Sequence, residues 1–88
     1  MRSRYDPAKA AANVRKHGVS FADAEGVLTD PLAITIEDPD AEGERRYVAI
    51  GLGNSGELLV VVYAEHGEEC RLISARRATR KERRTYEG

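Results

Sequence analysis

Residues 57–65, ELLVVVYAE, decide the fold, because apolar side chains occupy nearly every position rather than every second one. A strand of this kind is buried on both faces and lies inside a sheet. The runs on either side, RRYVAIGL at 45–52 and CRLISA at 70–75, predict its two neighbours. The links GNSG (53–56) and HGEE (66–69) are too short for a crossover, so the three strands are expected to form an antiparallel meander.

Two further strands are indicated upstream. The segment LAITIE at 32–37 alternates in character, which predicts a half-buried fourth strand. Its two faces would carry Leu32, Ile34 and Ile36 on one side and Ala33, Thr35 and Glu37 on the other. The acidic loop DPDAEGE at 38–44 separates this strand from the next one. RSRY at 2–5 has the length of a short extra edge strand at the N-terminus.

Two helices are predicted before the meander. The first follows Asp6, a good N-cap, has Pro7 at its first position and ends at Gly18. The second is SFADAEGVLTDP at 20–31, which opens with a capping-box spacing, carries an apolar stripe and stops at the Asp-Pro pair.

A third, C-terminal helix is predicted from Arg80, because Thr79 and Glu82 have the T-x-x-E spacing of a capping box. This helix is short and almost entirely polar, and such a helix is marginal on its own. We expect it to dock on the sheet through Tyr86 or to need a partner.

Together these elements predict a single α+β domain over residues 1–88. It would contain two N-terminal helices, a four-stranded antiparallel meander with room for a short N-terminal strand, and a short C-terminal helix. With 88 residues, the core is thin and a deep enclosed pocket is not expected. The single Cys70 fits a reducing compartment, and no secretory signal or membrane span is recognisable, so we expect a cytoplasmic protein without a membrane partner.

Charge is strongly segregated along the chain, although the net charge is only −1. Residues 1–17 carry five Lys/Arg against one Asp, a net charge of +4, and residues 71–88 carry seven against two, a net charge of +5. Residues 18–70 carry two against twelve, a net charge of −10. The two basic ends either converge into one cationic face that attracts polyanions or are simply solvated; charge alone leaves both interpretations open.

No strong catalytic signature is present. The sequence lacks metal-ligand spacing, phosphate-binding glycine loops and the G-x-S-x-G motif, so we expect neither a metal site nor a cofactor. Strand parity predicts two faces for the 70–75 strand, one with Cys70, Leu72 and Ser74 and the other with Arg71, Ile73 and Ala75. If the strand continues, Arg76 joins Ser74.

Two arginines are candidates for phosphate binding. Arg46 and Arg76 on neighbouring strands could clamp one phosphate, since a guanidinium fork matches phosphate oxygens. On residue type alone the better-favoured interpretation is that each pairs with an acid such as Glu44, Glu65 or Glu69. His17 fits either a general base or acid or a helix-end residue that interacts with the dipole. Core filling is the more common role for the remaining candidates, Tyr5, Tyr63 and Tyr86, although tyrosines also stack on bases.

Several segments in combination resemble the BrnT family of toxins of type II toxin–antitoxin systems. They are YDPAKAAANVRKHGVSFADAEGVLTDPLA (5–33), RRYVAIG (45–51), LLVVVYAE (58–65) and RLISARRATRKERRTYE (71–87). The resemblance implies a RelE-like fold and a metal-independent endoribonuclease that cleaves RNA and inhibits translation. It also implies a cognate, DNA-binding, BrnA-like antitoxin, with operator DNA contacted only through that antitoxin.

The same resemblance implies site residues. Arg46, Ser74 and Arg76 would surround the scissile phosphate, and either His17 or Glu65 would accept the proton of the attacking 2′-OH. The expected RNA-binding residues are Tyr5, Lys16, Arg71, Arg80, Arg83 and Tyr86. Two positions depart from the family pattern: Tyr5 stands where Trp is frequent, and Ala64 stands where Thr is common.

A second interpretation is a toxin-fold module that lacks catalysis and pairs with an antitoxin for operator repression. The catalytic interpretation needs Arg46 and Arg76 within reach of one phosphate. If Arg46 and Arg76 lie on opposite faces of the sheet, the catalytic interpretation fails.

Overall fold

The computed structural model describes residues 2–88, and its helices begin at the predicted caps. The Asp6 and Ser20 side chains accept hydrogen bonds from backbone N–H groups of the first turns of the first two helices. Thr79 and Glu82 form a complete capping box. These local bonds fix the three N-termini as the sequence predicts. The described helices are α1 (Pro7–His17), α2 (Phe21–Thr29) and α3 (Arg80–Glu87).

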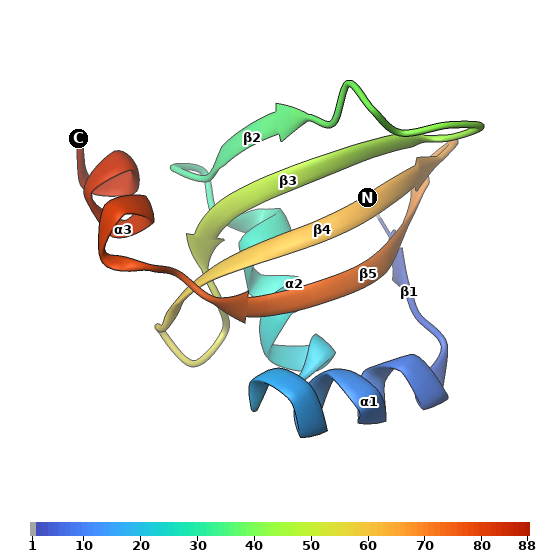
Figure 1. The fold of residues 1–88 in the computed structure, drawn as a ribbon, viewed down its shortest axis with the longest axis horizontal. Coiled ribbons are helices and arrows are strands. Elements are labelled where there is room, and N and C mark those ends of the chain that lie inside the picture. The colour runs from blue at the N-terminus through green and yellow to red at the C-terminus, as the bar shows by residue number, and fades with distance from the viewer. Residues whose placement is uncertain (1) are drawn as a thin grey trace.

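The strands form one five-stranded sheet in the order β1-β5-β4-β3-β2 (Figure 1). The predicted meander is confirmed, with each strand from β2 to β5 antiparallel to the next. The short N-terminal strand is also present, and it pairs in parallel with β5. The strands are β1 (Arg2–Arg4), β2 (Ile34–Glu37), β3 (Arg45–Leu52), β4 (Leu58–His66) and β5 (Glu69–Arg77).

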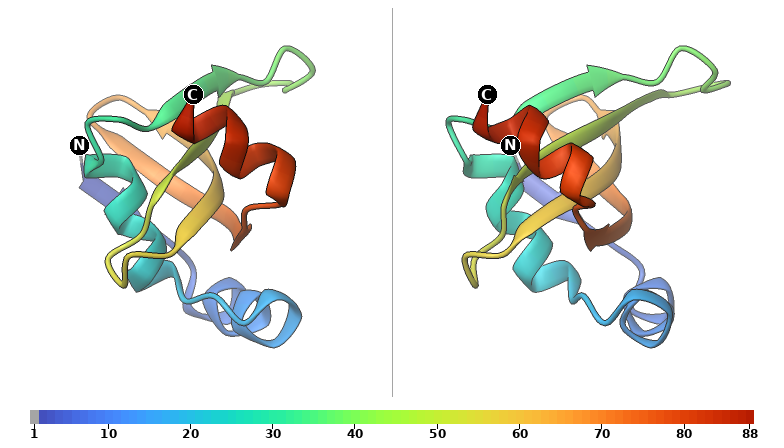
Figure 2. Two further views of the ribbon diagram at one scale, coloured as in Figure 1. Left: turned by 90° about the vertical axis from the view of Figure 1, so that its left-hand side faces the viewer. Right: turned by 60° about the vertical axis from the view of Figure 1, so that its left-hand side comes forward.

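Helix α2 lies against one face of the sheet, α1 lies along the β5 side of the sheet, and α3 follows the end of β5 (Figures 1 and 2). The core forms between α2 and the sheet, because the side chains of β3, β4 and β5 on that face are apolar. Its buried members include Phe21, Val27, Leu59, Val61, Tyr63, Leu72 and Ala75. The thin core that the chain length predicts is therefore a single layer between helices and sheet.

The other face of the sheet, here called the open face, is not covered by α1 or α2. The register places Arg46, Val48 and Ile50 of β3 on this face, beside alternate residues of β4. Ile36 pairs with Val48 and is 63% exposed. The prediction that one face of the 32–37 strand is buried is thus wrong for Ile36. The residues of this strand do alternate, but the apolar side chains of Ile34 and Ile36 lie on the open face.

A bulge in β5 changes the predicted strand parity. Val62 pairs with Ser74 while Tyr63 pairs with Leu72, so Ile73 is an extra residue in β5. One extra residue reverses the side-chain alternation beyond it. Ala75 therefore joins Leu72 in the core, and Ser74 moves to the face that carries Arg71. The prediction that grouped Ser74 with Leu72 is wrong for this reason, whereas Arg76 does share the face of Ser74.

Helix α1 is joined to β5 through Asn13, which is 6% exposed. Its amide nitrogen donates to Ala75 O at 2.9 Å, and its amide oxygen accepts from Ala75 N at 3.1 Å. The same amide nitrogen donates to Val19 O at 2.9 Å. Strand β1 pairs only with residues 69–71 of β5, so the outer backbone groups of Ala75 have no neighbouring strand. Asn13 binds these groups in place of that strand.

Helix α3 docks as predicted, through Tyr86. Its hydroxyl donates to Asp30 Oδ2 at 2.7 Å, and the same carboxylate accepts from the backbone N–H groups of Leu32 and Leu52. These bonds, that from Tyr86 first, hold the pKa of Asp30 below its ordinary value. Asp30 thus ties α3 to the end of α2 and to β3. Among residues 2–88, no helix is both long and apolar enough to cross a membrane.

Candidate active site

One carboxylate gathers two arginines and a histidine at the end of the open face. Glu44, the last residue of the acidic loop, lies 2.6 Å from Arg71 Nη2, 3.0 Å from His66 Nε2 and 3.6 Å from Arg46 Nε. The sheet register creates this cluster, because Arg46 and Arg71 both pair with Ala64, from opposite sides of β4. His66 follows Ala64 by two residues and so shares its face. We call these four residues the Glu44 cluster.

Cationic donors outnumber acceptors in the Glu44 cluster. Desolvation acts to raise the pKa of Glu44, but the charges of Arg71, His66 and Arg46 outweigh it together and hold this pKa below its ordinary value. Glu44 is therefore ionised at neutral pH. The Nε atoms of Arg46 and Arg71 are buried and have no hydrogen-bond partner among the described residues. The side chains of Arg46 and Arg71 are nevertheless 43% and 40% exposed, so a second anion, such as a phosphate, can approach their guanidinium groups.

The residue types of the Glu44 cluster suit acid–base chemistry at a phosphate. A carboxylate and a histidine are the usual side chains for proton transfer, and the two guanidinium groups can stabilise developing negative charge. Among residues 2–88, no group of three or more His, Cys, Asp or Glu side chains gathers as metal ligands would.

Sequence reasoning named two members of this cluster and missed the other two as functional residues. Arg46 was expected at the scissile phosphate and Arg71 among the RNA-binding residues, whereas Glu44 was considered only as a pairing acid. His66 received no role, because it lies far in sequence from His17. One signal could have identified His66. It lies at the end of the central strand, two positions after Ala64, the residue that pairs with both Arg46 and Arg71.

Ser74 and Arg76 lie on the same open face as Arg46, so the geometric condition that would exclude catalysis is not met. Arg76 is nevertheless not beside Arg46, so the prediction that the two arginines clamp one phosphate from neighbouring strands is wrong. The two stand two strands and four residues apart, about 16 Å between Cα atoms at ordinary sheet spacings. Each pairs with its own acid, Arg46 with Glu44 and Arg76 with Glu82.

The Arg76–Glu82 pair is bidentate, with both nitrogen–oxygen distances 2.8 Å. Glu82 also accepts from Thr79 N at 2.8 Å. The hydrogen bonds from Arg76, followed by those from Thr79, lower the pKa of Glu82 to about 2 although desolvation opposes them. Arg76 therefore anchors the start of α3 as well as facing the open side of the sheet.

A second cleft of about 210 Å³ lies between α1 and β5 beside the bulge. It brings together Lys16 and His17, both expected from the family resemblance, with Lys9 and Ser74. The two basic segments adjoin here, because α1 packs on β5 and β1 pairs with it, but both lysines of this cleft come from α1. His17 and Ser74 thus share a basic cleft, separate from the residues that contact Glu44.

The remaining candidates are distributed over the fold. Glu65 follows Tyr63 by two residues and lies on the helix-covered face, away from Arg46. Tyr63 is 9% exposed and stacks on Tyr47 at 5.4 Å, so it fills the core. Tyr86 is engaged with Asp30. The α3 residues expected to bind RNA, Arg80 and Arg83, are exposed.

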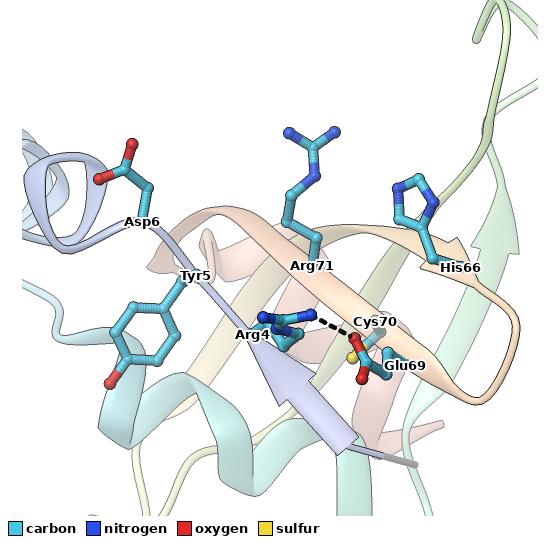
Figure 3. A pocket seen from close by; sticks show the side chains of 7 residues that line it. All are labelled: Arg4, Tyr5, Asp6, His66, Glu69, Cys70 and Arg71. Atoms are coloured by element: carbon cyan, nitrogen blue, oxygen red, sulfur yellow. Dashed lines mark hydrogen bonds and ion pairs between the residues drawn. The ribbon is translucent and has the colours of Figure 1, made fainter.

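A larger cleft of about 340 Å³ lies at the β1 side of the Glu44 cluster (Figure 3). His66 and Arg71 line it, so it is continuous with that cluster. Arg4, Tyr5, Asp6, Glu69 and Cys70 complete its walls. Tyr5, expected to stack on a base, is 37% exposed and contacts the Phe21 ring edge-on, with centroids 5.3 Å apart.

Comparison with known proteins identifies both a family and a similar solved structure. Residues 5–82 match the family model described as the ribonuclease toxin, BrnT, of type II toxin–antitoxin systems. The fold is similar to the 1.1 Å crystal structure of the Brucella abortus ribonuclease toxin, BrnT, with 28% sequence identity and a TM-score of 0.65. That match covers 91% of this chain and 100% of the Brucella chain. No curated protein sequence matches significantly.

Proposed function

This chain belongs to the BrnT family of ribonuclease toxins of type II toxin–antitoxin systems, and on that premise we propose that it cleaves RNA at the Glu44 cluster. The proposed reaction uses the RNA 2′-OH as nucleophile and needs no metal ion. The observation that supports this site is the sharing of one carboxylate by Arg46, His66 and Arg71 within 3.6 Å.

In the proposed reaction Glu44 accepts the proton of the 2′-OH while the 2′-oxygen bonds to the adjacent phosphorus. Protonated His66 donates its proton to the 5′-oxygen as the phosphorus–oxygen bond to that leaving group breaks. The products are a 2′,3′-cyclic phosphate and a 5′-hydroxyl. Both side chains then return to their starting protonation states by exchange with water.

The arginines stabilise the charge on the phosphorus centre. Arg46 and Arg71 approach from opposite sides of β4, and their side chains are 43% and 40% exposed. A bound phosphate would draw arginine donors away from Glu44. Because those donors now lower the pKa of Glu44, their transfer to the phosphate makes the carboxylate a stronger base at the moment of reaction.

The other predicted residues are proposed to hold the RNA rather than to react. Ser74 and Arg76 extend the open face away from the Glu44 cluster, and Lys16 and His17 lie in the basic cleft beside Ser74. Exposed Arg80 and Arg83 add charge on α3. Contacts of this kind are sequence-independent and make binding salt-sensitive. Cleavage of cellular RNA by this surface would inhibit translation.

A cognate antitoxin protein is implied by the family. We propose that it is a DNA-binding, BrnA-like protein and that the complex contacts operator DNA only through it. The overall charge of −1 supports this division, since duplex DNA binding draws chiefly on cationic contacts to phosphates.

The proposal is tested with purified protein and an end-labelled RNA. Glu44→Gln keeps the size of the side chain but removes its ability to accept a proton, and we expect at least about a 100-fold loss of cleavage rate. Glu42→Gln is the matched control, because Glu42 is an exposed residue of the same acidic loop and the change in charge is identical. Its rate should equal that of the wild type.

Equal rates for Glu44→Gln and wild type would remove Glu44 from the chemistry. Absence of any cleavage by folded wild-type protein, together with tight antitoxin binding, would instead support the interaction module that lacks catalysis.

A further inference from the structure

The cleft lined by Arg4, Tyr5, Asp6 and Glu69 adjoins the proposed site of cleavage. It shares the side chains of His66 and Arg71 with the Glu44 cluster, and its volume of about 340 Å³ is that of a small-ligand site (Figure 3). A nucleotide whose phosphate lies between Arg46 and Arg71 would therefore have this cleft beside it. The chemistry of the walls indicates what part of the nucleotide enters.

The charges of the cleft favour an uncharged base over a second phosphate. Arg4 lies beside Glu69, with its Nη1 donating to Glu69 Oε2 at 3.0 Å. The second cation, Arg71, is engaged by Glu44 at 2.6 Å. Both guanidinium groups that line the cleft are thus engaged by carboxylates, and the Asp6 carboxylate adds negative charge that would repel a second phosphate.

Acceptors therefore predominate among the polar groups that can contact a base. Glu69 Oε1 has no hydrogen-bond partner among the described residues, while Oε2 is held by Arg4. Asp6 uses Oδ1 to cap α1. The Arg4–Glu69 pair consequently presents carboxylate acceptors next to guanidinium donors.

We propose that this cleft is a guanine-binding pocket that selects the nucleotide next to the scissile phosphate; this inference rests on the proposed function. Guanine carries two adjacent donors, N1–H and N2–H₂, beside one acceptor, O6. The Glu69 carboxylate accepts from the two donors, and Arg4 donates to O6. Cytosine and adenine each offer one donor group on this edge, and uracil offers one donor between two acceptors.

The Tyr5 ring provides an aromatic wall for the base. Its edge-on contact with buried Phe21 fixes its position, and its 37% exposure leaves part of the ring accessible from the cleft. Stacking on an aromatic side chain is tolerant of base identity. Tyr5 therefore contributes affinity, whereas the Arg4–Glu69 pair contributes selectivity.

The test is a titration of the whole protein with the four ribonucleoside 3′-monophosphates, followed by calorimetry. Guanosine monophosphate should bind at least tenfold more tightly than the other three, since a bidentate pair discriminates by about that factor or more. Glu69→Gln should abolish this preference, because an amide group supplies only one acceptor. Glu68→Gln, an identical charge change in the adjacent turn, should retain it.

Equal affinities for the four nucleotides, or an undiminished preference for guanosine monophosphate in Glu69→Gln, would overturn the pocket. Cleavage mapping separates this result from the fate of the proposed function. RNA cleavage without a bias toward guanosine would refute the pocket and leave the nuclease intact. Guanosine-selective binding that Glu69→Gln abolishes, in a wild-type protein that cuts no RNA, would support the pocket and refute the proposed catalysis.

Discussion

Replacement of Asn13 by alanine is expected to cost about 3 kcal/mol of folding free energy. The side chain is 6% exposed and makes three hydrogen bonds, two with Ala75 backbone atoms and one with Val19 O. A hydrogen bond contributes about 0.5–1.5 kcal/mol net, and a buried group left unpaired costs roughly 1–3 kcal/mol. Asn13→Ala removes the partner of all three backbone groups at once.

Urea unfolding followed by circular dichroism measures this loss. The midpoint should fall with an unchanged slope, since the surface exposed on unfolding hardly changes. Asn54→Ala is the control: its amide nitrogen donates one exposed hydrogen bond to Ala22 O, so its loss should stay below about 1 kcal/mol. If Asn13→Ala costs no more than Asn54→Ala, Asn13 does not replace a missing strand beside β5.

Three further changes test separate parts of the structure. Tyr86→Phe removes the 2.7 Å bond to Asp30 and should speed amide exchange throughout α3, at a cost of about 1 kcal/mol; unchanged exchange would show that α3 is held elsewhere. The pKa of Glu82 is about 2 in the folded chain, chiefly through Arg76, against an ordinary value of 4.5. The ionised Glu82 therefore stabilises the folded state in full above pH 4.5, and this contribution is lost as the pH falls toward 2. Glu82→Gln should therefore flatten the dependence of unfolding free energy on pH across that window, and an unaltered slope would contradict the pairing. Gly26→Ala would place a Cβ against the backbone nitrogen of Asn54 in the facing loop and should destabilise by about 1–3 kcal/mol in thermal unfolding, whereas wild-type stability would show that the loop can move.

The elements of the fold were predictable because their signals are local. Asp6, Ser20 and Thr79 each cap a helix through a backbone N–H within the next three residues. The apolar run of β4 likewise identifies the middle of the sheet without knowledge of its neighbours. Such signals depend on adjacent residues alone, and the sequence contains them in full.

The strand parity of β5 was not predictable, because nothing in CRLISA marks Ile73 as an extra residue. Bulges in strands are often signalled by glycine, and Ile73 is a good strand former. The extra residue places Ala75 against the core, where Asn13 binds its backbone. Tertiary contacts with α1 therefore decide a local detail of the strand.

The candidate site was predictable only in part for a related reason. Arg46 follows from the resemblance, but the Glu44 cluster depends on the register of three strands, which brings together residues up to 27 positions apart. Arg71 and Ala64 pair only because β4 and β5 are aligned as they are. Residue type indicates that an arginine will find an acid, but the register decides which one.

The most direct test of the central claim is cleavage of an RNA that carries a single 2′-deoxynucleotide at the mapped cut site, compared with the all-ribose RNA, in the presence of EDTA. The account predicts that wild-type protein cuts the all-ribose RNA, leaves a 2′,3′-cyclic phosphate and a 5′-hydroxyl, and spares the deoxy-substituted site. It also predicts that Glu44→Gln cuts neither RNA at an appreciable rate. Cleavage at the deoxy site, 5′-phosphate ends, or activity abolished by EDTA would contradict it.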